Sequence, residues 1–184
     1  MVNDEAFAEL VAGHHAEIYR YLVRVTGRTS DADDLSQETF LRAFRAYASG
    51  KLCGDARAWL FAIATNLMRN HFRSQKRRRR AHDALIRDAA AEPDGADGHG
   101  SGREVGELIE NVIAELPLKQ RAAFLQRKVH GFEYDTIAKN LGCSPDSARA
   151  NVFQATKKIR RALDGRQHGP ESRTESQACR KEIS

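Results

Sequence analysis

Apolar residues recur at helical spacing along most of the chain. Near the N-terminus the regularly spaced positions are Phe7, Leu10, Val11, Ile18, Leu22 and Val25. Steps of three and four residues place these side chains on one helix face, and Gly27 is expected to end that helix. No alternating apolar and polar run lies between hairpin turn signals, so strands are not expected. The pattern therefore predicts an all-α protein.

Two more helices are predicted before residue 80. The first starts in an acidic stretch, where Asp31 or Asp33 can cap it, and ends near Tyr47. After a short loop, Asp55 is expected to cap a long third helix. The apolar face of this third helix carries Trp59, Ile63 and Leu67. The same helix is expected to continue into a run rich in arginine and lysine.

Residues 81–104 differ in composition from the helical segments around them. They are rich in Ala, Gly and Asp and show no apolar periodicity. Such a segment cannot build a core, so we expect a flexible linker. It divides the chain into two small helical domains, residues 5–80 and residues 105–165. Residues 166–184 are polar and aperiodic, and a disordered tail is expected there.

The second domain shows the pattern of several short helices. The first has a clear apolar face made of Val105, Leu108, Ile109, Val112, Ile113 and Leu116. Pro117 is expected to stop it and to open a helix at about 118–129. A helix over 134–141 should end at Gly142, and Ser144 should cap a last helix that has Pro145 in its first position.

The last two helices have the pattern of a helix-turn-helix. Apolar positions on both sides of Gly142 can pack together, which projects the second helix toward the DNA major groove. The outward positions expected to meet DNA are Ser147, Arg149, Asn151, Gln154, Lys157 and Lys158. Arginine suits guanine and amide side chains suit adenine, whereas the two lysines suit phosphates. An ordinary helical hairpin with a solvated charged face is the less favoured interpretation.

A polar stripe follows the long third helix beside its apolar face. Asn66, Asn70, Arg73 and Arg77 recur at helical steps. Amides and guanidiniums close to an aromatic residue such as Trp59 can bind unstacked bases along a single strand. Spacing alone is weak support for this interpretation, because a tryptophan at such a position is more often a core residue than a stacking platform.

Charge is unevenly distributed along the chain. The formal net charge is +5, but residues 1–40 hold eight acids and three bases, a balance of −5, so the remainder carries +10. Residues 69–80 contain seven bases and no acid, and residues 147–163 contain five bases and no acid. Two separate basic surfaces suggest two contacts with one polyanion. Phosphates repel carboxylates, so the acidic segment that begins at Asp31 should face a different partner.

Several classes of protein are made improbable by composition. Cys53, Cys143 and Cys179 are widely spaced and form no metal-binding pair, and the histidines do not cluster. No metal or other cofactor is expected. No nucleophile–base set or phosphate loop is present, so an enzyme is not expected. No apolar run reaches the roughly 20 residues of a membrane span, and the first residues lack a signal pattern, so a cytoplasmic protein is expected.

Four segments together resemble the extracytoplasmic-function group of bacterial sigma factors. They lie in the order found in that family, at residues 31–40, 57–67, 116–121 and 131–138. The first reads Asp-Ala-Asp-Asp-Leu-Ser-Gln-Glu-Thr-Phe and the second Arg-Ala-Trp-Leu-Phe-Ala-Ile-Ala-Thr-Asn-Leu. Each segment alone is moderate support, whereas the four together are specific.

The resemblance implies a role for each surface. It implies that the β′ clamp helices of core RNA polymerase bind the acidic helix at Asp34, Gln37, Glu38, Phe40 and Arg42, and that the β subunit of the polymerase is a further partner. It implies that Asn66, Asn70, Arg73, Arg77 and Trp59 recognise and help to melt the −10 element of promoter DNA. The helix-turn-helix would bind the −35 element, and an anti-sigma factor would control the protein. Recognition-helix positions such as Ala150 and Phe153 depart from the residues usual in the family.

Two other functions remain open from the sequence alone. A stand-alone helix-turn-helix repressor or activator would need only residues 105–163 and would leave the acidic motif unexplained. An RNA-binding protein could use residues 69–80.

Overall fold

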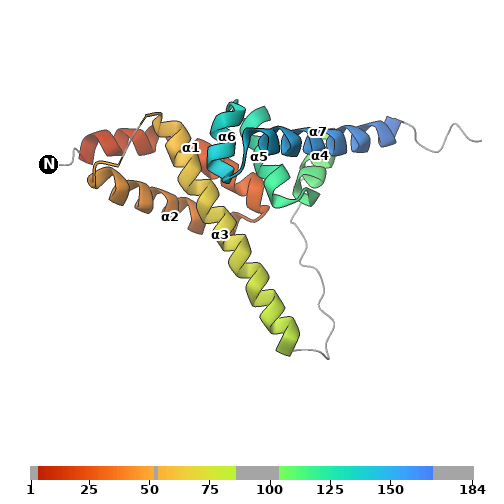
Figure 1. The fold of residues 1–184 in the computed structure, drawn as a ribbon, viewed down its shortest axis with the longest axis horizontal. Helices are drawn as coiled ribbons and strands as arrows, with labels where there is room; N and C mark the ends of the chain where they lie inside the picture. The colour runs from red at the N-terminus through yellow and green to blue at the C-terminus, as the bar shows by residue number, and fades with distance from the viewer. Residues whose placement is uncertain (1–3, 52–53, 86–103, 168–184) are drawn as a thin grey trace, which may run out of the picture.

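The chain is helical throughout the part described by its structure, a computed structural model that covers residues 4–51, 54–85 and 104–167 (Figure 1). These residues form seven α-helices and no strands. The first three helices are α1 (Asp4–Thr26), α2 (Thr29–Ala48) and α3 (Ala56–Leu85), which we call the N-terminal unit. The C-terminal unit contains α4 (Glu104–Glu115), α5 (Leu118–Lys128), α6 (Tyr134–Leu141) and α7 (Pro145–Gln167). The predicted all-α class is confirmed.

Three of the predicted helix ends are present. The Asp55 carboxylate accepts a hydrogen bond from the backbone N–H of Arg57 at 2.9 Å, which caps α3. The Ser144 hydroxyl does the same for the N–H of Ser147 at 3.2 Å, at the start of α7. Gly142 ends α6 with a φ of +58°, a left-handed conformation that suits glycine.

The predicted cap of α2 is wrong. This helix begins at Thr29, with Arg28 at the N-cap position, so Asp31 and Asp33 lie inside it. The Thr26 hydroxyl organises the turn by donating to the carbonyl of Arg28 at 2.9 Å. A carboxylate in the first turn still interacts favourably with the helix dipole. Asp31 therefore stabilises the start of α2 without capping it.

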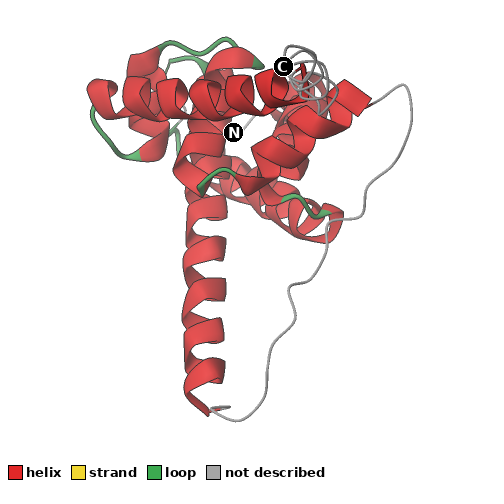
Figure 2. Ribbon diagram, turned by 90° about the vertical axis from the view of Figure 1, so that its right-hand side faces the viewer, coloured by secondary structure: helices red, strands yellow, loops and turns green. Residues whose placement is uncertain are grey.

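Helix α3 is longer than its core-forming part. It continues past residue 80 to Leu85, and its C-terminal half extends away from the other helices (Figure 2). The side chains of residues 76–80, all basic, are exposed. The predicted linker falls mostly on residues 86–103 and the predicted tail on residues 168–184, both outside the described residues.

One hydrophobic core joins the two units. Its buried members include Tyr21 and Phe61 from the N-terminal unit and Leu125 and Ile137 from the C-terminal unit. A smaller cluster in the C-terminal unit is built around Leu116, Ala155 and Ile159. Helix α3 packs on α6, and α1 packs on α5 (Figure 1). The apolar pattern predicted a core for each unit and did not show that the two units would pack together.

Candidate nucleic-acid interface

The acidic face of α2 is open to solvent. Asp34 and Gln37 are exposed, because buried Leu35, Ser36 and Thr39 turn the opposite face of the helix inward. Glu38 is half-buried and forms an ion pair with exposed Arg42 one turn later. Phe40 is half-buried and stacks on the His15 ring of α1, with the ring centroids 5.4 Å apart. The five predicted polymerase-binding residues are Asp34, Gln37, Glu38, Phe40 and Arg42, and of these Asp34, Gln37 and Arg42 are exposed.

Two apolar side chains beside this acidic face were missed by the sequence analysis. Leu41 is 45% exposed and Phe44 is 39% exposed, although both are large hydrophobic residues. Phe44 touches Phe7 edge to face, with ring centroids 5.2 Å apart. Leu41 and Phe44 do not follow the spacing of the buried residues of α2, and this was the sequence signal that could have identified them. The outer surface of α2 therefore offers carboxylates, amides and apolar contact together.

The predicted polar stripe lies on one exposed side of α3. Asn66, Asn70, Arg73 and Arg77 are all exposed, while Ala64, Leu67 and Met68 face the core. Trp59 is half-buried and packs against the core from the N-terminal end of the helix. The stripe therefore presents two amides followed by two guanidiniums, with Trp59 at its margin.

A basic groove lies between α3 and the C-terminal unit. It is lined by eight basic side chains from both units: Arg28, Arg69, Arg73, Lys76, Arg79, Arg80, Lys119 and Arg121. Asp31 is the acidic residue of this lining, and its carboxylate lies 3.4 Å from the His71 ring. Phe72 and Leu118 add apolar surface. Such a lining attracts polyanions.

The helix-turn-helix packs as predicted. Ile137, Ala138 and Leu141 of α6 are buried, as are Ala148 and Val152 of α7. The predicted DNA-facing residues of α7 differ in exposure: Arg149, Gln154, Lys157 and Lys158 are exposed, whereas Ser147 and Asn151 are half-buried.

Two of the predicted base-reading side chains have partners within the protein. Asn151 donates from Nδ2 to the carbonyl of Ser147 at 2.8 Å. Arg149 donates to Asp146 at 3.0 Å and lies over the Tyr134 ring, 5.4 Å from its centroid. Phe153, which was not among the predicted contacts, is 64% exposed on the same helix. Contact with bases through Arg149 or Asn151 would replace these internal bonds.

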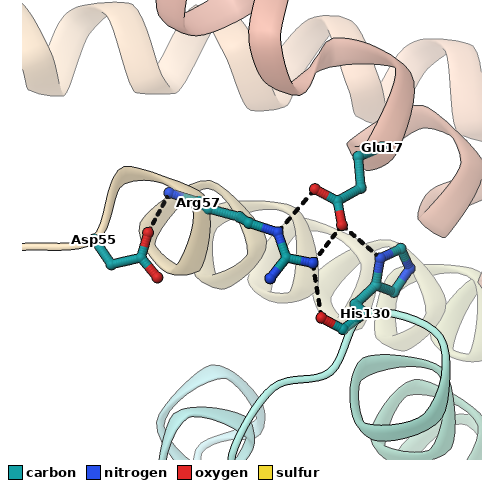
Figure 3. A network of polar contacts seen from close by, with 4 residues as sticks. All are labelled: Glu17, Asp55, Arg57 and His130. Atoms are coloured by element: carbon teal, nitrogen blue, oxygen red, sulfur yellow. Dashed lines mark hydrogen bonds and ion pairs between the residues drawn. The ribbon is translucent and has the colours of Figure 1, made fainter.

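An ionic network of Glu17, Arg57 and His130 crosses between the two units (Figure 3). Arg57 of α3 donates from Nε to Glu17 of α1 at 2.9 Å, and its Nη2 also pairs with that carboxylate. The same Nη2 donates to the backbone carbonyl of His130 at 2.7 Å. His130 follows α5, and its Nδ1 lies 2.9 Å from the Glu17 carboxylate. One arginine thus holds a carboxylate of its own unit and a carbonyl of the other unit.

The surroundings fix the charge states of the network. The hydrogen bond from Arg57 lowers the pKa of Glu17 to about 2, so this carboxylate is ionised. Burial lowers the pKa of His130, and this outweighs the opposing effect of Glu17. The ring is therefore neutral, and it donates its Nδ1 proton to Glu17. Its Nε2 is buried and has no hydrogen-bond partner among the described residues.

A second set of polar side chains is completely enclosed between the units. We call Tyr21, Thr65, Gln126 and Asn140 the buried quartet, since each is at most 2% exposed. Gln126 donates to the Tyr21 hydroxyl at 3.0 Å and to the Thr65 hydroxyl at 3.1 Å. Asn140 donates to the Gln126 carbonyl oxygen at 2.9 Å. The Tyr21 and Thr65 hydroxyls are 3.1 Å apart.

Aromatic contacts and one close backbone approach complete the interface between the units. The Phe61 ring of α3 lies 4.8 Å from Phe132 and 4.7 Å from His130, measured between centroids. A Cβ at Gly142 would come within 3.1 Å of the Arg69 guanidinium. The turn of the helix-turn-helix therefore sits directly against α3.

The described residues give no sign of a metal centre or a membrane span. They contain no group of three or more candidate metal ligands, and none of their helices is long and apolar enough to cross a membrane. Cys143 is a free, half-buried thiol in the turn before α7. Cys53 and Cys179 lie outside the described residues.

A helix-turn-helix unit, packed on a helical bundle that presents amides and guanidiniums, defines a two-part nucleic-acid-binding protein. Residues 10–78 match the family model described as Sigma-70 region 2, and residues 106–159 match the one described as Sigma-70, region 4. The chain is 32% identical over 171 residues to the RNA polymerase sigma-H factor of Pseudomonas aeruginosa, covering 88% of each chain. It is also 32% identical over 155 residues to the ECF RNA polymerase sigma factor SigC of Mycobacterium tuberculosis, covering 83% of this chain and 80% of that one.

Solved structures show the same fold. The sigma factor RpoE from Bartonella quintana, in complex with the anti-sigma factor NepR, matches with a TM-score of 0.69 at 22% identity, over 87% of this chain and 98% of that one. CnrH, in complex with the cytosolic domain of CnrY, matches with a TM-score of 0.60 at 25% identity, over 89% and 90%. The chain belongs to the sigma-70 family, in its extracytoplasmic-function (ECF) group. The resemblance and the function of a transcription-initiation factor are confirmed, and the alternative based on residues 105–163 alone does not explain the match to region 2.

Proposed function

We propose that this sigma factor binds core RNA polymerase through α2, reads the −10 element with α3 and reads the −35 element with α7. The observation that carries this assignment is the separation of chemistry among three exposed helix faces. Helix α2 offers carboxylates, whereas α3 and α7 offer amides and basic groups. A DNA surface and a protein-binding surface of opposite charge can then act at the same time.

The polymerase-binding surface is centred on Asp34 and Gln37. Their exposure leaves both side chains free to bond a partner, and Leu41 and Phe44 beside them supply apolar contact area. Interfaces of this kind combine an apolar centre with a polar rim. The Glu38–Arg42 ion pair can rearrange at little cost, because exposed ion pairs contribute about 1 kcal/mol or less.

The −10 surface is the exposed stripe of α3. Asn66 and Asn70 can bond the edges of an unstacked base, while Arg73 and Arg77 follow the phosphates beyond it. Extruding a base costs a few kcal/mol of lost stacking, so contacts to that base must offset this cost. Trp59 at the margin of the stripe offers a ring face for the extruded base.

The −35 surface is the outward side of α7. Gln154 and Arg149 are exposed and have donor groups suited to base edges in the major groove. Lys157 and Lys158 lie one turn further along, in a position to neutralise phosphates. Ser147 and Asn151 would add contacts once the bond from Asn151 to the Ser147 carbonyl is exchanged.

Control by an anti-sigma factor is supported by the structural relatives. The matched structure of RpoE contains NepR, which is described as an anti-sigma factor. We infer that this chain is also bound by an anti-sigma factor. The protein itself performs no catalytic step in this proposal, because the polymerase carries out RNA synthesis.

The polymerase assignment is tested by measuring the affinity for core RNA polymerase with labelled protein. Asp34→Ala combined with Gln37→Ala should weaken binding at least about tenfold, since two exposed contacts near an interface centre are lost. Glu110→Ala, an exposed acid on α4, is the matched control and should bind as the unmodified chain does. Equal affinities for all three proteins would overturn the assignment to α2.

A further inference from the structure

The basic groove has no part in the proposed function. It is lined by eight basic side chains and a single acid, Asp31, whose carboxylate lies 3.4 Å from the His71 ring. Of the four stripe residues of α3, Arg73 alone belongs to the lining, so the groove lies along a different side of that helix. Its cations come from both units: Lys119 and Arg121 lie on α5, and the others lie on α3 or just before α2. The chain therefore has a concentrated positive surface besides its two proposed DNA surfaces.

The positive charges of the groove are not balanced within the protein. Apart from Arg28, these side chains form no ion pair with a carboxylate among the described residues. Arg121 is partly buried; it donates to the backbone carbonyls of Val25 and Leu116, and its Nε has no partner in the described part of the chain. Burial lowers the pKa of Arg121, since desolvation disfavours a cation that has no counter-ion. A bound anion would stabilise this cluster of like charges.

Two helix N-termini add partial positive charge to the same groove. Helix α2 begins beside it at Thr29, and α5 begins beside it at Leu118. Neither helix has a side-chain hydrogen bond at its N-cap, which is Arg28 in α2 and Pro117 in α5. The first backbone N–H groups of a helix have no partner within it, and they favour anions such as phosphate. Side-chain and backbone charges in the groove thus have the same sign.

The dimensions of the groove fit a small ligand that carries several phosphates. Its volume is about 960 Å³, within the range of roughly 300–1,000 Å³ that is usual for small-molecule sites. From Arg69 to Arg80 the lining extends roughly 16 Å along α3, at about 1.5 Å per residue. One phosphate cannot meet cations over this length, whereas a chain of phosphates can, and guanidiniums bind phosphate oxygens in pairs. The apolar surface at Phe72 and Leu118 is small, although a protein partner would need an apolar centre.

We propose that the basic groove between α3 and α5 is a binding site for a compact polyphosphate, either an inorganic chain or the polyphosphate group of a nucleotide. The phosphates would lie along α3 from Arg69 to Arg80 and reach Lys119 of α5. Phe72 in the same lining offers a ring face to the base of a nucleotide. This site goes beyond the proposed function and does not depend on it, because neither polymerase nor promoter DNA takes part in the binding.

Isothermal titration calorimetry of the full chain at physiological salt tests the site with inorganic phosphate, tripolyphosphate and adenosine triphosphate. Tripolyphosphate should bind at a single site and at least about tenfold more tightly than inorganic phosphate, because several charge-assisted bonds form at once. Adenosine triphosphate that binds more tightly than tripolyphosphate would assign the site to nucleotides. Equal or weaker binding of the nucleotide would assign it to inorganic polyphosphate.

A pair of double variants locates the binding. Arg79→Ala with Lys119→Ala removes one exposed base from each side of the groove. Arg20→Ala with Lys128→Ala removes two exposed bases that lie outside the lining and is the matched control. The groove variant should bind tripolyphosphate at least about tenfold more weakly, and the control should stay within about twofold of the unmodified chain. Circular dichroism should show the same helical content in all three proteins, since the replaced side chains are exposed.

Two results would overturn the polyphosphate site. Absence of saturable tripolyphosphate binding, or an equal loss of affinity in the groove variant and the control, would leave the groove with no more than general surface charge. A short duplex without promoter elements that binds more tightly than tripolyphosphate, and loses affinity in the groove variant, would make the groove a DNA site instead. Failure of the proposed function is distinguishable, because it would appear in polymerase binding and leave these titrations unchanged.

Discussion

At the scale of single residues, chemistry at the contact between the units decides how tightly they pack. Glu17 is held ionised and His130 neutral by their surroundings, and Arg57 bonds to both residues. The charged and titratable groups facing the His130 ring are Glu17, Tyr21 and Arg24 from α1 and Arg57 from α3. Protonation of the ring would add a positive charge close to two arginines.

Acid is therefore expected to weaken the packing of the two units. When the units separate, His130 becomes hydrated and titrates near 6.5, whereas burial lowers its pKa in the closed state. Its contribution is fully present above about pH 6.5 and is lost as the pH falls toward the lowered value. The stabilising contribution of the ionised Glu17 carboxylate is lost only at lower pH, between pH 4.5 and about pH 2. The radius of gyration should therefore be larger at about pH 5.5 than at about pH 7.5. His130→Gln should flatten this dependence, and an unchanged profile in that variant would contradict the role of His130.

Gly142 provides a second residue-scale prediction. Alanine there meets both a positive φ of +58° and the Arg69 guanidinium at 3.1 Å. Gly142→Ala should lower the free energy of unfolding by about 1 kcal/mol or more. Gly13→Ala is the control, because Gly13 lies within α1 and has no atom within 4 Å of the added carbon. That variant should be stabilised by about 0.5–1 kcal/mol. Thermal unfolding of the two variants checks the difference, and equal shifts would argue against strain at the turn.

At the scale of elements, helices were predictable from the sequence, but their contacts across the units were not. Apolar spacing predicted the helices, and the caps at Asp55 and Ser144 follow from local bonding that a short stretch of sequence specifies. The cap of α2 was mispredicted, because Thr26 organises that turn from outside the acidic stretch. Gln126 gave no signal, since its partners lie far away in the chain at Tyr21 and Thr65.

The candidate sites were likewise predictable where they depend on spacing along one helix, and less so where they depend on contacts between helices. Residues on one helix face, such as Asn66 and Asn70, were predictable because regular spacing alone places them on a common surface. Exposure was harder to predict, since it depends on how a helix is covered by its neighbours. Half-buried Asn151 and exposed Phe153 on α7 are the examples.

Helix α7 allows base readout and phosphate contact to be separated experimentally. Gln154→Ala should cost about 1–3 kcal/mol of binding to the preferred −35 sequence and relax discrimination at one base pair. Lys157→Ala should weaken binding to all sequences and reduce the salt dependence by about one unit of slope. Fluorescence anisotropy on duplexes with single base changes, at several salt concentrations, distinguishes the two variants. Identical profiles would contradict the assigned roles.

At the scale of the whole molecule, one shared core leaves three helix faces exposed, and these are the surfaces proposed for polymerase and for the two promoter elements. The acidic face of α2, the amide stripe of α3 and the basic side of α7 all remain largely exposed while the units pack together. The turn before α7 lies against Arg69 of α3, so the surfaces proposed for the −10 and −35 elements are neighbours in this arrangement.

The account's central claim is that this chain directs promoter-specific initiation. The direct measurement is in vitro transcription of genomic DNA by core RNA polymerase with and without the protein, followed by mapping of transcript starts. The account predicts discrete new starts, each preceded by a shared pair of −10 and −35 elements. Those starts should be lost with Asn66→Ala combined with Asn70→Ala, although polymerase binding persists. The absence of any new start in the presence of bound protein would contradict the claim.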